Sequence, residues 1–129
     1  MRKTFFTLSL FVTVFFLFKN EINAQANNSS STILRHIVII TFKPDASADS
    51  IKALDNVYSE LSKSSLVKDF EMGVNISTRD TSLKHIYVTS FASKENMDNY
   101  RKIPEYGNLF KLSLPLAADV TVADYWVKK

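Results

Sequence analysis

The sequence of 129 residues contains no cysteine, two glycines and two histidines. Without cysteine, the chain cannot supply disulfide bonds, thiol nucleophiles, cysteine-based zinc sites or iron–sulfur clusters. Two glycines are too few for the glycine-rich loops that bind phosphate groups. The two histidines match no metal-ligand spacing, so we expect neither a metal ion nor a cofactor.

Neither sign of charge dominates the chain, which has 16 basic and 13 acidic residues. Three of the basic residues and one of the acidic residues lie within positions 1–26, which leaves 13 basic and 12 acidic residues in the rest. A solvated surface explains Lys94, Arg101, Lys102 and Lys111 better than a nucleic-acid groove, because no aromatic side chains are interleaved with them. We therefore expect no nucleic-acid partner.

The long apolar run of the chain, residues 5–18, follows Arg2 and Lys3 and precedes the small-residue pattern at residues 24–26. A basic start, an apolar centre and a small-residue site together predict a secretory signal peptide over residues 1–26. As a helix, the 14 apolar-run residues span about 21 Å, less than the roughly 30 Å of a membrane core. We expect a secreted or periplasmic protein without a stable membrane anchor after cleavage.

The polar segment 27–32 predicts a flexible leader, and the folded domain is expected over residues 33–129. Runs of β-branched and aromatic residues predict strands. Apolar residues three and four positions apart, following the capping residues Ser47 and Ser93, predict helices, and Pro104 predicts a further short helix. In chain order we expect strand 33–43, helix 47–63, strand 67–77, strand 84–92, a helix from 93, a short helix from 104 and strand 119–127.

In the second of these strands, Phe70, Met72, Val74 and Ile76 alternate with polar residues and with Gly73, which predicts a half-buried strand. The whole order is β-α-β-β-α-β, the ferredoxin-like unit of an α+β fold. Two helices can cover one face of a four-stranded sheet but not both.

The uncovered face of that sheet is predicted to be apolar. It carries four aliphatic side chains, those of Ile37, Ile39, Ile86 and Val88. Each large aliphatic side chain left in water loses about 2 kcal/mol of stabilisation that burial would provide. We therefore expect a homodimer that joins two such faces into a dimeric α/β barrel. A monomer that tolerates exposed apolar residues is the alternative.

Three segments of the chain resemble a known family. Residues 36–47 (HIVIITFKPDAS), 70–77 (FEMGVNIS) and 85–93 (HIYVTSFAS) are similar to successive parts of the stress-responsive dimeric A/B barrel domain, abbreviated Dabb. The resemblance extends over about residues 33–127. It implies a homodimeric ferredoxin-like barrel, and it implies no established activity, because most members have none.

One branch of this family, the olivetolic acid cyclase-like branch, uses a tyrosine and a histidine as an acid–base pair within a His-Pro-x-His motif. Tyr100 and Pro104 match that branch, but Ile103 and Tyr106 stand where its two histidines would be. The missing histidine removes the expected base, so the resemblance does not carry cyclase activity to this chain.

His36 and His85 lie in the two central strands, at positions that match family histidines lining a cavity between sheet and helices. Either imidazole could accept a proton near neutral pH. With Tyr100 and Tyr106 they are the candidate catalytic residues. The alternative is a buried neutral histidine with a backbone or tyrosine partner, which we favour because no acidic residue is expected to orient either ring.

Leu54, Tyr58, Tyr87 and Phe91 are the candidate lining of a small aromatic pocket between helices and sheet, although plain core packing is the alternative for each. Two functions follow. The first is a homodimeric domain that binds a small apolar or aromatic molecule, or acts structurally, without catalysis. The second is a cofactor-independent enzyme, cyclase-like or monooxygenase-like, that moves protons with the histidines and tyrosines. The sequence leaves this choice open.

Overall fold

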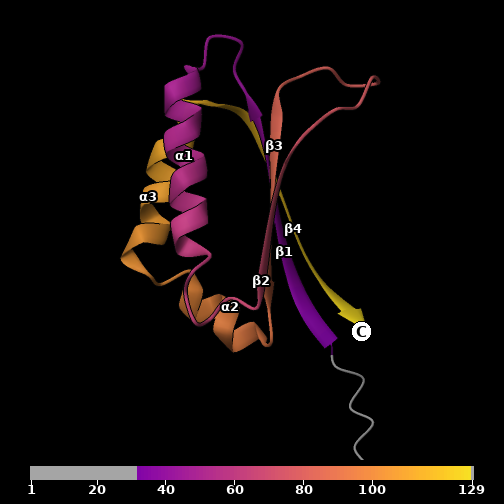
Figure 1. Ribbon diagram of the computed structural model, residues 1–129, viewed down its shortest axis with the longest axis vertical. Coiled ribbons are helices and arrows are strands. Elements are labelled where there is room, and N and C mark those ends of the chain that lie inside the picture. The colour runs from indigo at the N-terminus through magenta and orange to yellow at the C-terminus, as the bar shows by residue number, and fades with distance from the viewer. Residues whose placement is uncertain (1–31, 129) are drawn as a thin grey trace, which may run out of the picture.

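Four strands form one antiparallel sheet, and three helices lie against one of its two faces (Figure 1). This arrangement is that of a computed structural model, which describes residues 32–128. The elements are β1 Thr32–Phe42, α1 Ala48–Leu61, β2 Asp69–Val74, β3 Lys84–Phe91, α2 Lys94–Tyr100, α3 Pro104–Ser113 and β4 Ala117–Lys128. The predicted signal peptide and the predicted leader up to position 31 lie outside the described residues, whereas Thr32 belongs to β1. None of the described helices is both long enough and apolar enough to cross a membrane.

The strands lie in the order β2-β3-β1-β4, and all three neighbouring pairs are antiparallel. The first and last strands of the described chain are therefore neighbours. Because α1 connects β1 to β2, and α2 and α3 connect β3 to β4, the topology is the ferredoxin-like one. The predicted α+β fold class is confirmed.

Local sequence signals determine where the helices begin. Ser47 Oγ accepts a hydrogen bond of 3.1 Å from the Ser50 N–H, and Ser93 Oγ accepts one of 3.1 Å from the Asn96 N–H. Each bond satisfies an N–H group that the first turn of a helix leaves without a partner. Pro104, which has no N–H group to satisfy, lies in the first turn of α3.

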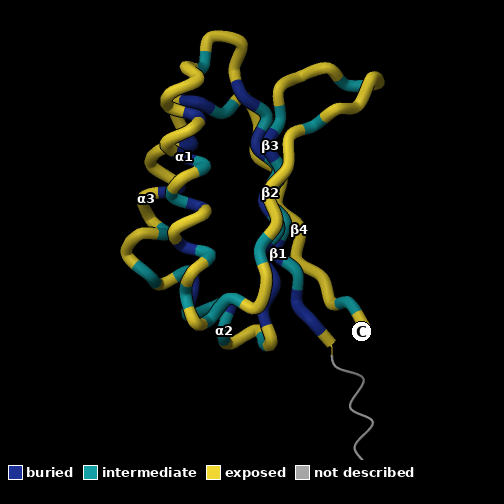
Figure 2. The backbone as a smooth tube through the Cα atoms, in the orientation of Figure 1, coloured by how far each residue is buried: buried dark blue, intermediate teal, exposed yellow. Residues whose placement is uncertain are grey.

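The core lies between the helices and the two central strands of the sheet. Val38 and Ile40 of β1, Tyr87 and Phe91 of β3, and Leu54 of α1 are all buried there. Figure 2 shows the buried segments of the helices and of the sheet facing one another across this layer. The alternation along β1 and β3 therefore predicts correctly which side chains face the helices.

β2 is not the half-buried strand that its alternation predicts. Phe70 is partly buried, but Met72 and Val74 are exposed, and Ile76 is 93% exposed. β2 is an edge strand of the sheet, and it ends before Ile76. An alternating pattern therefore identifies the strand, but burial also requires a helix above it, and the core between helices and sheet is built on β1 and β3.

The opposite face of the sheet carries the apolar residues predicted for it. Ile37 pairs with Val88, and Ile39 pairs with Ile86, across the two central strands. All four are partly exposed, and no described element covers this face (Figure 1). We call these four residues the open face.

Candidate functional site

His36 of β1 forms a hydrogen-bonded cluster with Asp124 of β4 and with Arg101, which directly follows α2. The imidazole Nδ1 lies 2.6 Å from Asp124 Oδ1, and Arg101 Nη2 lies 2.9 Å from Asp124 Oδ2. Directly opposite residues of an antiparallel pair point to the same face, and His36 is opposite Asp124. The expectation that no acidic residue orients His36 is wrong, because its partner comes from a strand 88 residues away.

The pKa values in this cluster describe an ion pair. Partial burial by itself raises the pKa of the Asp124 carboxyl, but hydrogen bonds from His36 and Arg101 outweigh burial and lower it. Burial by itself lowers the pKa of the Arg101 guanidinium, but the hydrogen bond and charge of Asp124, together with Tyr106, raise it overall. Asp124 is therefore ionised at neutral pH and holds the Nδ1 side of the His36 ring.

The other ring nitrogen of His36 is buried and has no hydrogen-bond partner among the described residues. His36 as a whole is 3% exposed. When Nδ1–H donates to Asp124, Nε2 carries a free lone pair that can accept a proton or a hydrogen bond. A buried acceptor without a partner is costly, so a donor group on a bound molecule would stabilise this position.

His85 of β3 belongs to a second cluster, with Asp55 of α1 and Tyr87 of β3. Asp55 Oδ1 lies 2.9 Å from His85 Nδ1 and accepts a hydrogen bond of 2.7 Å from the Tyr87 hydroxyl. Burial, and then the hydrogen bond to Asp55, raise the pKa of Tyr87 above its usual value, so this phenol remains a donor. His85 therefore also has an acidic partner that the sequence pattern did not reveal, here from a helix 30 residues away.

The two histidines do not share one site. His85 lies opposite Ile40 in the pairing of β1 with β3. Ile40 is four positions beyond His36, which is about 13 Å along a strand. Any chemistry at His36 is therefore separate from any chemistry at His85.

Two of the candidate tyrosines lie near His36 rather than His85. The rings of Tyr100 and Tyr106 are in edge contact, with centroids 5.4 Å apart. Burial and the nearby Tyr106 raise the pKa of Tyr100 to about 12, although a hydrogen bond with Thr89 opposes this shift. Thr89 is the residue opposite His36 on β3. The structure thus brings His36, Tyr100 and Tyr106 into one neighbourhood.

A small cavity of about 150 Å³ opens between α3, α1 and the helix-facing side of β1 and β4. Its walls are mostly aliphatic and aromatic, and they are formed by Val38, Ile40, Tyr58, Tyr106, Leu109, Phe110, Ser113, Val120 and Val122. We call it the tyrosine cavity, because two tyrosine rings line it. Of the predicted pocket residues, Tyr58 lies on its wall.

The other three predicted pocket residues lie deeper. Leu54, Tyr87 and Phe91 are each at most 1% exposed and belong to the core. Tyr87 nevertheless supports the cavity, because the Tyr58 ring stacks on it with centroids 3.7 Å apart and planes 13° from parallel. Burial, followed by the nearby Tyr106, raises the pKa of Tyr58, so its hydroxyl stays protonated at the cavity wall.

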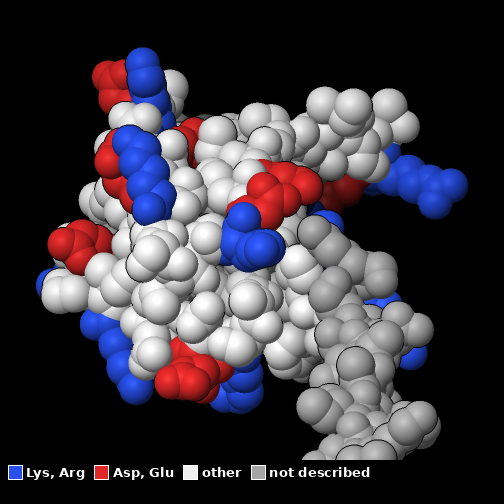
Figure 3. Space-filling view, turned by 60° about the horizontal axis from the view of Figure 1, so that its bottom comes forward, with Lys and Arg blue, Asp and Glu red and all other residues white. Residues whose placement is uncertain are grey.

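The basic residues near α2 do not form a continuous positive groove. Lys94 pairs with Asp98 at 2.7 Å, and Arg101 pairs with Asp124. Figure 3 shows basic and acidic side chains beside one another on the face that it draws. Within residues 32–128, no group of three or more histidine, cysteine or acidic residues is placed to hold a metal ion.

A sequence model of the stress responsive A/B barrel domain, Dabb, matches residues 34–127. The chain belongs to the Dabb family. This match spans all seven elements of the described fold, and it confirms the resemblance seen in the first three strands. A comparison with curated proteins gives no match.

Solved structures share this Dabb fold. A dimeric ferredoxin-like protein of unknown function from Thermobifida fusca is 14% identical, with a TM-score of 0.66 over 75% of this chain and 92% of that chain. Hydroxynitrile lyase from Passiflora edulis is 22% identical, with a TM-score of 0.67 over 75% of this chain and 94% of the lyase. A protein from Arabidopsis thaliana is 26% identical, with a TM-score of 0.62 over 71% of this chain and 92% of that chain.

Proposed function

We propose that this Dabb protein is a homodimer that binds a small apolar or aromatic molecule in its tyrosine cavity. The observation that carries the proposal is the cavity itself, about 150 Å³ in volume and walled by aliphatic side chains and two tyrosines. A cavity of about this size accommodates a single six-membered ring. The stacked pair of Tyr58 and Tyr87 supplies a fixed aromatic wall.

The homodimer is the part of the proposal that the open face supports. Four aliphatic side chains of the central strands remain partly exposed there, and covering them removes their remaining apolar surface from water. A second copy supplies an equally apolar face, and a symmetric pair of such faces is self-complementary. The Thermobifida fusca neighbour of the same fold is itself described as dimeric.

The proposal also locates the protein outside the cytoplasm, in the periplasm or secreted. Support comes from the N-terminal sequence, in which a basic start, an apolar run and a small-residue site follow one another within residues 1–26.

Ligand binding is tested with p-cresol, which has one ring and one polar group, by thermal shift and by NMR titration. Val120, on the cavity wall, is replaced by Phe to fill the space, and Val74 is replaced by Phe as the control. Both valines are about half exposed on the helix-facing side of an edge strand. We expect p-cresol to raise the melting temperature of the wild type and of Val74→Phe but not of Val120→Phe. No shift in the wild type, or equal shifts in all three proteins, would refute binding in this cavity.

A second candidate function, proton transfer without a cofactor, is favoured by one observation. Asp124 fixes Nδ1 of His36, and the opposite nitrogen is a buried acceptor with no partner among the described residues. An imidazole held in this way by a carboxylate can act as a general base, and Tyr100 and Tyr106 are the nearby phenols that could polarise a carbonyl. His85 would not take part in the same step, because it lies in the other cluster.

This second function is tested by hydrogen–deuterium exchange at the α-carbon of acetophenone in D₂O at pH 7. We expect the wild type to exceed the buffer rate, and both His36→Gln and Asp124→Asn to lower the excess by at least about tenfold, the lower range of general-base effects. His85→Gln should leave it unchanged. A wild type no faster than buffer would reject catalysis of this kind while leaving the binding proposal untouched.

A further inference from the structure

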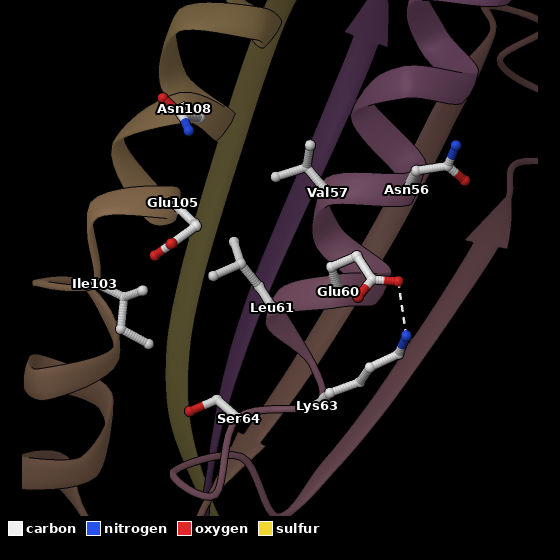
Figure 4. Close-up of a pocket in the computed structure, with 9 residues that line it drawn as sticks. All are labelled: Asn56, Val57, Glu60, Leu61, Lys63, Ser64, Ile103, Glu105 and Asn108. Atoms are coloured by element: carbon white, nitrogen blue, oxygen red, sulfur yellow. Dashed lines mark hydrogen bonds and ion pairs between the residues drawn. The ribbon is translucent and has the colours of Figure 1, made fainter.

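A second and larger hollow, separate from the tyrosine cavity, lies between α1 and α3 (Figure 4). Its volume is about 520 Å³, within the range of about 300–1,000 Å³ that is typical of small-molecule sites. Its walls are formed by Asn56, Val57, Glu60, Leu61, Lys63, Ser64, Ile103, Glu105 and Asn108. No residue lines both hollows. We call it the interhelical groove.

α3 contributes two polar side chains, Glu105 and Asn108, to the lining of the groove. Figure 4 shows Glu105 and Asn108 on the side of α3 that faces Val57 and Leu61 of α1. Helices close against each other when apolar ridges fit into apolar grooves. Glu105 and Asn108 are both exposed, so neither is buried in the contact between the two helices.

The floor and the rim of the groove have different chemistry. Val57, Leu61 and Ile103 supply apolar surface, and Leu61 is buried. Two glutamates border the groove, Glu60 on α1 and Glu105 on α3, and Figure 4 shows the Glu60 carboxylate turned toward Lys63 and away from α3. The floor therefore favours an apolar body, and the rim favours a positive charge.

The one lysine of the groove does not neutralise both carboxylates. Lys63 Nζ lies 2.7 Å from Glu60 Oε1. Glu105 forms no ion pair within residues 32–128. A cation that enters the groove would thus find the Glu105 carboxylate available, with Asn108, three positions further along α3, as a further acceptor.

We propose that the interhelical groove binds an organic cation, a molecule of drug size with an apolar body and a protonated amine. The apolar body lies on Val57, Leu61 and Ile103, and the ammonium group is directed to Glu105. Volume, floor and rim charge are independent observations, and all three fit this class of ligand. The proposal does not depend on the tyrosine cavity or on catalysis.

The test uses three probes with the same apolar body: 4-phenylbutylamine, 4-phenylbutan-1-ol and 4-phenylbutanoate. Each is titrated into the isotopically labelled full chain and followed by NMR. We expect the amine to bind about two- to fivefold more tightly than the alcohol, the gain of an exposed ion pair, and the carboxylate to bind most weakly. The side-chain amide signals of Asn56 and Asn108 should shift.

Glu105→Gln keeps the shape of the rim and removes its free charge. We expect the amine to bind this variant no better than the alcohol does. Glu95→Gln, at an exposed position in the first turn of α2, is the control and should preserve the preference for the amine. Glu105 also lies in the first turn of α3, where its charge favours the helix, so affinity is the readout rather than melting temperature.

Val57→Thr tests the apolar floor with a side chain of the same shape, and it should weaken all three probes together. Equal affinity of the wild type for the three probes, shifts confined to the tyrosine cavity, or an amine preference that survives Glu105→Gln would each overturn the proposal. Failure of all three probes to bind would also overturn it, and would favour a partner helix as the occupant instead.

Discussion

The two faces of the sheet are built from the same kinds of residue but have opposite surroundings. Along β1, Val38 and Ile40 are buried beneath the helices, while Ile37 and Ile39, one position away, remain partly exposed on the open face. The helix side also carries the polar clusters of His36 and His85. Residue type therefore does not decide burial in this protein. The layer that covers each face does, and for the open face the chain supplies none within the described residues.

The largest effect is expected from a mutation that introduces a charge into the open face, because it should disrupt the proposed dimer. Ile37→Asp places two carboxylates in the proposed dimer interface, where an unpaired charge costs several kcal/mol to bury, and should weaken the dimer about 1,000-fold or more. Sedimentation velocity of the purified protein measures this. The monomer should keep its fold, because Ile37 contacts no element of the helix layer.

Ile76→Asp is the control for that change, since Ile76 is 93% exposed and lies beyond the end of β2. It should leave the dimer intact. A wild type that sediments as a monomer at micromolar concentration would contradict the homodimer.

The second-largest effect is expected from a mutation that creates a cavity in the core between the helices and the sheet. Leu54 is fully buried, and Leu54→Ala should lower the free energy of unfolding by about 3 kcal/mol, as lost transfer energy and an empty space add together. Leu83→Ala, at a half-exposed position, should cost less than about 0.5 kcal/mol. Urea denaturation compares the two. Similar losses would mean that the helix face is not the main core.

Alkaline pH should destabilise the protein, because it ionises tyrosine hydroxyls that are buried between the helices and the sheet. The pKa of Tyr100 rises from 10.0 to about 12 in the folded protein, and those of Tyr58 and Tyr87 also rise. A raised tyrosine pKa stabilises the fold fully below pH 10, and this contribution is lost between pH 10 and 12, because the unfolded chain ionises first.

For Tyr100 alone, the free energy of unfolding should fall by about 2 to 3 kcal/mol by pH 12. Unfolding monitored between pH 8 and 12 checks it, and Tyr100→Phe should flatten that part of the curve. A wild type as stable at pH 12 as at pH 9 would contradict the burial of these hydroxyls.

A smaller effect on stability is expected in the cluster of His36, Arg101 and Asp124. Asp124→Asn removes the ion pair with Arg101 and the charge beside His36, and should cost about 1 kcal/mol, because the carboxylate is one-third exposed. The pKa of Asp124 is lowered in the fold, so its contribution is present above the ordinary value near 3.8 and is lost as pH falls further. Wild type and variant should therefore converge in stability at acid pH. A gap that stays constant from pH 7 to pH 2 would point to lost packing instead.

The smallest effect lies outside both faces of the sheet. Gly107 is an exposed residue within α3, and a methyl group added there meets no atom within 4 Å. Gly107→Ala should raise the free energy of unfolding by about 0.5–1 kcal/mol through helix propensity alone. Thermal or urea unfolding measures the gain. A loss of stability would show that α3 is not helical at this position.

Most of the fold could be predicted from the sequence because its signals are local. Ser47, Ser93 and Pro104 mark helix starts by hydrogen bonds or ring geometry within a few residues. Alternation along β1 assigns each side chain to a face without knowledge of the partner strands. Along β2 the same reasoning fails, because burial of Val74 depends on whether a helix passes above it.

The candidate site could be predicted only in part. His36 and His85 are visible as histidines in central strands, but their acidic partners are set by the register of β1 with β4 and by the position of α1 on the sheet. Asp124 carries a weak signal, since it shares a strand face with Val120 and Val122. Nothing local to Asp55 shows that it accepts hydrogen bonds from two β3 side chains.

The pairing of β1 with β4 has a consequence for the timing of folding. Its register runs from Thr32 with Lys128 to Phe42 with Ala117, and so joins the two ends of the domain. β4 leaves the ribosome after the other described strands, so until it emerges β1 has a partner on one side at most. Contacts this distant in sequence also form slowly. The pairing of β1 on both sides is therefore completed only after β4 has emerged, and a nascent chain stalled before Ala117 would expose the edge that β4 normally occupies.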